Sequence, residues 1–197
     1  MSNQIETQID VTLTERNRLT ALFRIILVVP MAIFVASFAP NWSNNSDSWT
    51  VGLLILPAAL AIVFRQIYPS YLLAFNEALL SLQTRVDAYV LLLTDEYPSI
   101  ERNPNVAVLL PDVDSGRKLN RGLPLIKWFL AIPLVIVGLI YSAVALIATF
   151  FAWVTTLSSG TYPKWALDIV LGTIKFWNRV YGYAIILVTD EYPSFAL

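Results

Sequence analysis

Two pairs of adjacent carboxylates stand in almost identical surroundings along the chain. Asp95 and Glu96 lie in the segment LLLTDEYPSI, and Asp190 and Glu191 lie in ILVTDEYPSF. Such carboxylates can bind a cation or transfer protons as a general acid and base. The hexamer TDEYPS also suits a structural role, because polar residues return an apolar run to water and proline prevents further helix. Tandem carboxylates are a weak motif by themselves, so we favour the structural interpretation and keep the functional one open.

The two hexamers supply the signature residues of the chain. Their threonine and aspartate can cap local backbone groups, and their tyrosine suits a membrane interface. On this interpretation each hexamer is an exit-and-turn element. The signature residues are Thr94, Asp95, Glu96, Tyr97 and Pro98 in the first hexamer, and Thr189, Asp190, Glu191, Tyr192 and Pro193 in the second.

Residue types that dominate active sites are absent. The 197 residues include no histidine and no cysteine, which excludes the commonest general base and any thiolate nucleophile. The sequence also contains no P-loop, GxGxxG, GxSxG or HExxH motif. We therefore assign no catalytic, cofactor-binding or metal-binding residue, and we expect neither an enzyme nor a cofactor. The basic residues form no separate patch, so nucleic acid is not an expected partner.

The hexamer belongs to a longer internal repeat. Further matches at corresponding positions are Asn17 with Asn120, Arg18 with Arg121, Arg24 with Lys127, Pro30 with Pro133, Tyr68 with Tyr162, Arg85 with Arg179, and Tyr89 with Tyr183. The polar stretch PNWSNNSDSW at residues 40–49 has no counterpart in the second half. We predict two tandem units, residues 1–103 and residues 104–197, with one loop lost from the second.

Hydrophobic segments of membrane-crossing length follow the start of each unit. The chain is 57% hydrophobic and 14% charged, whereas soluble domains have about 25% charged residues. Residues 25–39, 48–64 and 128–163 carry no charge, and a crossing helix needs about 20 apolar residues. We predict a transmembrane helix hairpin in each unit, with the second turn buried within residues 138–145. The alternatives are a re-entrant second hairpin and a soluble all-helical core.

The predicted fold is an all-α membrane protein with four transmembrane helices. Each unit opens with a short cytoplasmic β-strand segment, at residues 9–13 and 106–110, and continues through the hairpin. An amphipathic interfacial helix then leads into the hexamer. In residues 70–93 one arc holds Asn76, Glu77, Gln83, Thr84 and Asp87, and we expect this arc to face water.

Charge placement predicts the topology. All 13 lysines and arginines lie in segments that the two-hairpin arrangement places on one side, and the loop at residues 40–49 has none. The positive-inside rule then places both termini in the cytoplasm. Residues within reach of lipid headgroups on that side are Arg18, Arg24, Arg85, Arg121, Lys127 and Arg179.

The second unit resembles a bacterial membrane family known as domain of unknown function 4389. The resemblance rests on LIKWFLAIP, TYPKWALDIVLG, NRVYGY and LVTDEYPSF, and it extends over residues 117–195. The first unit departs from the family pattern, because YPSYLLAFNE stands where a YPRG…FDF stretch is usual. The resemblance implies a tandem membrane unit in the bacterial inner (cytoplasmic) membrane, and it implies no activity.

Three functional hypotheses follow. The first is a non-catalytic membrane interaction protein, either a self-assembling scaffold or an accessory subunit, with a homo-oligomer or other membrane protein subunits as partners. The second is a lipid-binding or membrane-shaping protein that uses its interfacial helices and basic junctions. The third is a transporter or enzyme, which requires the hexamer carboxylates and tyrosines to converge in one pocket.

Overall fold

The computed structural model describes residues 3–14, 16–38, 49–101 and 105–197. Residues 40–48, which include most of the polar loop predicted in the first unit, lie outside this description. The elements in chain order are β1 (Glu6–Ile9), α1 (Arg18–Ala36), α2 (Trp49–Arg65), α3 (Ser70–Val90), β2 (Val106–Leu109), the 3-10 turn η2 (Asp114–Gly116), α4 (Leu123–Ser159), α5 (Lys164–Tyr181) and the π-helical η3 (Gly182–Ile186).

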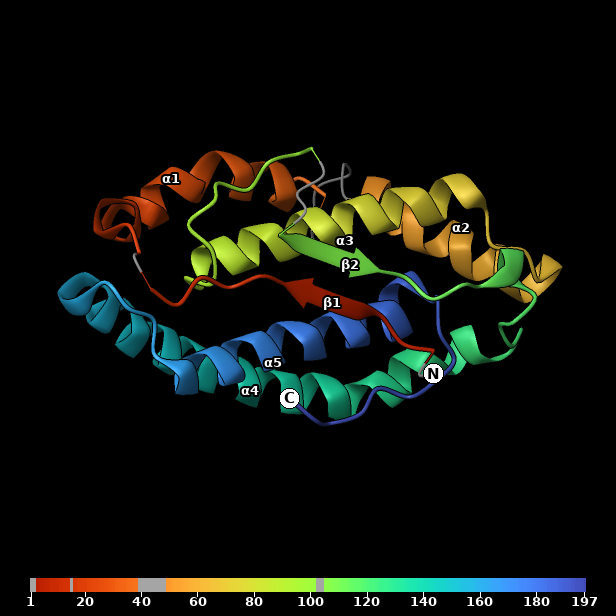
Figure 1. Cartoon of the computed structure of the whole chain (residues 1–197). Coiled ribbons are helices and arrows are strands. Elements are labelled where there is room, and N and C mark those ends of the chain that lie inside the picture. The colour runs from red at the N-terminus through yellow and green to blue at the C-terminus, as the bar shows by residue number, and fades with distance from the viewer. Residues whose placement is uncertain (1–2, 15, 39–48, 102–104) are drawn as a thin grey trace.

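The helices form two layers with a short ribbon of sheet across them. Figure 1 shows α1, α2 and α3 on one side of the molecule and α4 and α5 on the other. Helix α4 packs along α5, and α1 packs on α3. Strands β1 and β2 pair antiparallel across the junction, with Glu6 opposite Leu109 and Ile9 opposite Val106. The mostly helical fold that the sequence predicts is therefore confirmed.

Local signals in the sequence set the helix ends. The Asn17 side chain accepts hydrogen bonds from the Leu19 and Thr20 N–H groups, so it caps the start of α1. Helices α3 and α5 each begin directly after a proline, Pro69 and Pro163, which sits in extended backbone. Helix α4 ends at Gly160, whose φ of 73° is in the left-handed region.

The predicted hairpin in the second half is wrong, because α4 is one continuous helix of 37 residues. Gly138, at the start of the expected turn, serves packing instead. A Cβ at this position would lie 2.7 Å from Trp177 Cζ2 on α5. Ser142 Oγ donates 2.8 Å back to the Gly138 carbonyl within the helix. The segment thus contains no residue that ends a helix, and contact with α5 stabilises it along its length. The predicted count of four crossing helices is not retained.

In the first half, α1 and α2 do not form a side-by-side hairpin. Figure 1 shows them one after the other along the same edge of the molecule. Helix α1 lies on α3 and α4, and α2 contacts α4 and η3. Their partners are therefore in the rest of the fold.

The first strand lies earlier than the sequence predicts. Strand β1 ends at Ile9, whereas the expected strand began there, and β2 agrees with the expected segment to within one residue. Tertiary contacts explain the shift. The Asn178 side-chain amide donates 2.9 Å to Thr7 Oγ1, which fixes the polar segment at residues 6–9 against α5.

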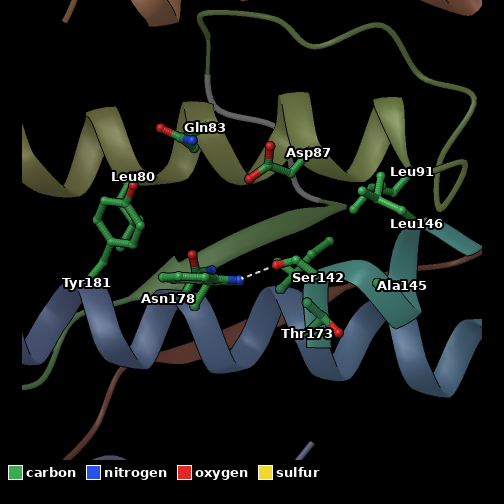
Figure 2. Close-up of a pocket in the computed structure, with 12 residues that line it drawn as sticks. Leu80, Gln83, Asp87, Leu91, Ser142, Ala145, Leu146, Thr173, Asn178 and Tyr181 are labelled. Atoms are coloured by element: carbon green, nitrogen blue, oxygen red, sulfur yellow. Dashed lines mark hydrogen bonds between the residues drawn. The ribbon is translucent and has the colours of Figure 1, made fainter. Parts of the chain in front are cut away.

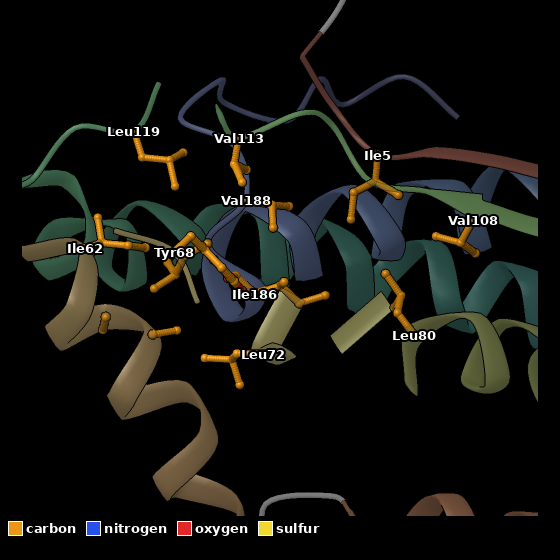
Figure 3. Close-up of a cluster of buried hydrophobic side chains, with 13 residues drawn as sticks. Ile5, Ile62, Tyr68, Leu72, Leu80, Val108, Val113, Leu119, Ile186 and Val188 are labelled. Atoms are coloured by element: carbon orange, nitrogen blue, oxygen red, sulfur yellow. The ribbon is translucent and has the colours of Figure 1, made fainter. Parts of the chain in front are cut away.

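One buried cluster joins the two halves of the chain. Figure 3 shows Ile5, Ile62 and Leu72 from the first half beside Val108, Ile186 and other residues of the second. Because a shared core cannot be divided without exposing apolar surface, the halves do not form separate globular bodies. The boundary predicted at residues 103 and 104 stays a prediction.

Two described helices, α1 and α4, are long and apolar enough to cross a membrane by length and composition. Only about a fifth of each candidate span is buried, 17% in α1 and 22% in α4. The core helix of a soluble domain would be mostly covered, and these two helices instead leave apolar side chains exposed.

Candidate functional site

The first hexamer is held by two buried arginines. Asp95 Oδ1 lies 2.5 Å from Arg24 Nη2 and 3.2 Å from Arg16 Nη2. Arg24 also donates to the Tyr89 carbonyl and, at 2.8 Å, to the Thr94 carbonyl. Its guanidinium carbon lies 4.5 Å from the centre of the Tyr89 ring, within the range of a cation–π contact.

Arg16 adds further bonds to the same cluster. It donates to the carbonyls of Leu93 at 3.1 Å and Leu92 at 2.5 Å. Burial lowers the pKa of Arg16, and the nearby Asp95 carboxylate opposes this shift. Asp95 in turn accepts 3.1 Å from the Asn17 N–H, so the hexamer is tied to the start of α1.

The second hexamer has the same arrangement with one lysine. Lys127 Nζ lies 2.7 Å from Asp190 Oδ1 and donates at 2.7 Å to the Thr189 carbonyl. The ammonium lies 5.2 Å from the centre of the Tyr183 ring. Asp190 accepts 2.6 Å from the Asn120 N–H just before α4. Each hexamer is therefore bonded to the start of the long apolar helix in its own half of the chain.

The other signature residues support the turn. Thr94 Oγ1 accepts 3.2 Å from the Glu96 N–H, and Thr189 Oγ1 accepts 3.1 Å from the Glu191 N–H. The threonine caps predicted from the sequence are thus present. Both prolines, Pro98 and Pro193, are buried.

The tyrosines pair in the same way in both hexamers. Tyr97 meets Tyr89 edge to face at 5.8 Å between ring centres. Tyr192 meets Tyr183 in the same geometry at 5.6 Å. Such pairs add stability beyond the area that they bury, so the tyrosines hold the hexamers onto the helices that precede them.

One further arginine anchors the chain after each hexamer. Arg85 donates 2.9 Å to the Ser99 carbonyl and 2.5 Å to the Glu101 carbonyl. Arg179 donates to the Ala196 carbonyl, which follows the second hexamer at the position corresponding to Glu101. Burial lowers the pKa of both arginines.

The six basic residues predicted to reach lipid headgroups differ in burial and in their partners within the chain. Arg24 is 2% exposed and Lys127 is 1% exposed, and both charges are neutralised within the chain. Arg85 and Arg179 hold backbone carbonyls. Arg18 and Arg121 are the two members of the set with exposed side chains, and Arg121 Nε donates 2.9 Å to Gln66 Oε1.

Reciprocal hydrogen bonds connect the halves. Tyr68 Oη donates 2.8 Å to the Ile186 carbonyl, and Tyr162 Oη lies 3.4 Å from the Leu91 carbonyl. Burial raises the pKa of both tyrosines to about 12.

The hexamer glutamates also form hydrogen bonds between the two halves of the chain. Glu96 accepts 2.7 Å from the Asn105 side chain, next to β2. Glu191 accepts 2.7 Å from the Asn3 N–H, next to β1. Each hexamer thus contacts the strand segment of the other half.

The hexamer carboxylates do not form a shared site. Each aspartate lies against the cation of its own half, and each glutamate bonds a separate asparagine. Within the described parts of the chain, no three acidic, histidine or cysteine residues are grouped as a metal site would require. The geometry is therefore that of two structural ion-pair clusters, which is the role that the sequence favours. We call Asp95 with Arg16 and Arg24 the first lock, and Asp190 with Lys127 the second lock.

A cavity of about 330 Å³ lies between α3, α4 and α5. Figure 2 shows Gln83 and Asp87 on α3 facing Asn178 and Tyr181 on α5, with Ser142 of α4 behind them. The Asp87 side chain is half-buried, and burial raises its pKa to about 7.

Asp87 is not among the site residues predicted from the sequence. The arc with Thr84 and Asp87 is predicted to face water, but Thr84 is fully buried and bonded to Asn178. One signal was available. At the offset that aligns Arg85 with Arg179, Thr84 aligns with Asn178 and Asp87 aligns with Tyr181. Polar residues matched across two apolar helices indicate a polar contact between those helices.

Comparison with known proteins gives one family. Residues 124–196 match the model of a family described as domain of unknown function, DUF4389. The match covers α4, α5 and the second hexamer, and it does not extend into the first half, so the tandem copies of this domain that the sequence suggested are not found. No curated protein and no solved structure matches the chain.

Proposed function

We propose that this chain is a non-catalytic membrane protein that acts through interactions, as a self-assembling scaffold or an accessory subunit. The observation that carries the proposal is the exposed apolar face along the whole of α4. Large apolar side chains are at least half exposed from Leu125 and Phe129 near its start to Leu146 and Phe150 toward its end. A surface of this kind marks a contact with lipid or with another protein.

Helix α1 presents a second apolar face. Leu19 is 70% exposed, Ile25 is 78% exposed and Ile33 is 65% exposed. The cation within the apolar part of this helix, Arg24, is turned inward to Asp95. In α4 the cation Lys127 is turned inward in the same way. Beyond Arg18 at the first residue of α1, the outward faces of both helices are thereby free of charge, as lipid contact requires.

The proposed arrangement consists of two similar units whose termini lie on one side of the membrane. Matched ion pairs, threonine caps and tyrosine pairs in the two halves support the tandem unit. The bond from Asn3 to Glu191 brings the N-terminal segment to the second hexamer, which supports a common side. By the positive-inside rule that side is the cytoplasm of a bacterial inner membrane.

The length of α4 sets its proposed orientation. Its 37 residues extend about 55 Å, whereas the hydrocarbon core of a bilayer is about 30 Å thick. A helix of this length that stays in contact with lipid is steeply tilted.

Cysteine labelling tests the membrane placement directly. The chain has no cysteine, so single-cysteine variants need no altered background. We expect Ile132→Cys, Ile140→Cys and Ile147→Cys to be protected from an impermeant maleimide in native membranes and labelled after detergent is added. The exposed Ser99→Cys and Ser194→Cys should label in inverted membrane vesicles. Full labelling of the α4 positions in intact membranes would contradict the proposal.

Native mass spectrometry after gentle extraction tests the interaction role. A homogeneous oligomer, or a stoichiometric partner subunit, is the expected result. A monomer that carries defined anionic lipids would contradict it and favour the lipid-binding alternative.

One observation keeps that alternative in view. Arg18 and Arg121 lie at the starts of the two apolar helices with exposed side chains. If the protein recognises anionic headgroups, the double change R18Q/R121Q should weaken retention of anionic lipid. The matched change R65Q/R117Q, at two other arginines of the chain, should weaken it less.

A further inference from the structure

The cavity between α3, α4 and α5 contains two kinds of polar group. One kind is already bonded within the protein. The Asn178 amide donates to Thr7 and Thr84, the Trp177 indole N–H donates 2.9 Å to Ser142, and Thr173 donates 2.8 Å to the Ile169 carbonyl. These groups shape the wall and are not free to bind a ligand.

The other kind is uncommitted. In the part of the chain that the structure describes, no hydrogen bond or ion pair reaches the side chains of Asp87, Gln83 and Tyr181. Figure 2 shows all three beside the same space between α3 and α5. The rest of the lining is largely apolar and includes Leu80, Ile174 and the Trp177 ring.

We propose that this cavity binds the primary ammonium group of an amphiphilic amine. An ammonium has three N–H donors. The cavity offers three acceptors: the Asp87 carboxylate, the Gln83 carbonyl oxygen and the Tyr181 hydroxyl oxygen. The apolar lining accommodates the body of the ligand, and the Trp177 ring provides a further favourable surface for a cation.

The electrostatics of the empty cavity agree with this assignment. Burial raises the pKa of Asp87 to about 7, because the carboxylate loses water around it and no cation of the described residues pairs with it. A bound ammonium would supply that charge. Among the lining residues Tyr181 is the other titratable group, with a pKa raised by burial and by Asp87, and α4 contributes none.

The position of the cavity suggests how an amphiphile enters. Leu146, which lines the cavity from α4, is 64% exposed, and its neighbour Ile147 on the outer apolar face is 60% exposed. The entrance therefore adjoins the surface that we propose to be in contact with lipid. A molecule with an apolar body can reach the cavity from that surface.

Calorimetric titration of the full chain in detergent tests the site with three small probes. Phenethylamine carries the primary ammonium. Phenethyl alcohol has the same body without charge, and its trimethylammonium analogue keeps the charge without N–H donors. We expect phenethylamine to bind at least tenfold more tightly than either analogue. Equal affinity for all three would overturn the assignment.

The variant Asp87→Asn keeps the size of the side chain and removes its charge. We expect it to weaken phenethylamine binding by about 10–100-fold, the usual effect of losing a charged hydrogen-bond partner. Asp168→Asn, on α5 and outside the lining, is the matched control and should bind like the wild type. Unchanged affinity of D87N, in a protein that is folded at the assay temperature as the control is, would refute the proposal.

The pH dependence gives a second readout. Because only the ionised carboxylate attracts an ammonium, wild-type affinity should fall about tenfold from pH 8 to pH 6, and the D87N profile should be flat. A wild-type profile as flat as that of D87N would contradict the role of Asp87. Short-chain phosphatidylethanolamine, compared with its choline analogue, then distinguishes a lipid amine from a free amine as the source. Failure of all the amines to bind would overturn the proposal without affecting the proposed membrane role.

Discussion

The two hexamer locks differ in their cations, although their geometry is the same. Asp95 faces two guanidinium groups, from Arg16 and Arg24, and Asp190 faces the single ammonium of Lys127. The aspartates are similarly exposed, at 27% and 24%. The position in the second half that corresponds to Arg16 is Leu119, which is buried in the same cluster as Leu187 and Val188. Figure 3 shows Leu119 in this cluster.

The difference in the number of cations shows which contacts the two locks share and which one is present in the first lock alone. The shared part is one cation from the apolar helix, the aspartate, and the tyrosine under the cation. Arg16 is the addition, and its donors bind carbonyls of Leu92 and Leu93. An arginine retains its charge in proteins, whereas a lysine can lose its proton. The first lock therefore depends more strongly on its carboxylate than the second.

Asp95→Asn should cause the largest loss of stability. It would leave two arginine charges buried without a counter-charge, so we expect the free energy of unfolding to fall by about 3–5 kcal/mol. Chemical denaturation in detergent, followed by tryptophan fluorescence, measures the change. The neighbouring change Glu96→Gln removes the same charge at an exposed position and should have a small effect. Similar losses for the two variants would mean that the ion pairs do not stabilise the fold.

Asp190→Asn should cost less, about 2 kcal/mol, because a neutral Lys127 needs no counter-charge. The comparison becomes sharper when both variants are measured at pH 7 and pH 9. The deficit of D190N should shrink at the higher pH, since the lysine then loses its proton more readily, while the deficit of D95N stays constant. Glu191→Gln serves as the control. Equal deficits at both pH values would contradict the proposed difference between the locks.

Asp87 extends the comparison to a carboxylate without a cation. Its folded pKa of about 7 lies above the ordinary value of 3.8, so the folded state holds more protons and stability falls as the pH rises from about 4 to about 7. Asp87→Asn should therefore stabilise the protein by about 1–2 kcal/mol at pH 8, a figure reduced for the partial exposure of the side chain. The gain should vanish below about pH 4. Thermal unfolding across this range checks the sign, and a gain that increased toward acid would refute it.

Arg16→Leu should have the smallest effect, because it gives the first lock the residue found in the second. The loss of its hydrogen bonds is partly offset by removing a buried charge, so stability should change by less than about 1 kcal/mol. In this background Asp95→Asn should cost less than in the wild type, since one buried cation is already gone. A double-mutant cycle measures this coupling. Additive effects of R16L and D95N would show that Arg16 does not act through Asp95.

Several features of the fold could be predicted because they depend on local chemistry. Long uncharged runs predict apolar helices, and most of α1 and most of α4 lie within them. A polar hexamer with a proline predicts a turn, and both hexamers form one that is capped by their threonines. The resemblance of the second half to a family of unknown function is confirmed over residues 124–196.

Other features could not be predicted from local patterns. The uncharged run of the second half is compatible with a hairpin. The close packing of Gly138 on Trp177 stabilises one continuous helix instead. Arg24 and Lys127 could snorkel to a membrane surface, but the aspartates turn them inward. A charged side chain takes the most favourable partner within reach, and sequence spacing alone does not show which partner is near.

The sequence by itself determined the residue types, the apolar runs and the matched positions of the two halves, because these depend on chain chemistry and order. The tertiary structure decided that the matched aspartates neutralise separate cations and that Asp87 lies beside Gln83 and Tyr181 with no ion-pair partner among the described residues. The physical reason is that electrostatic and packing energies depend on distance and burial. Both are fixed only when α3, α4 and α5 come together.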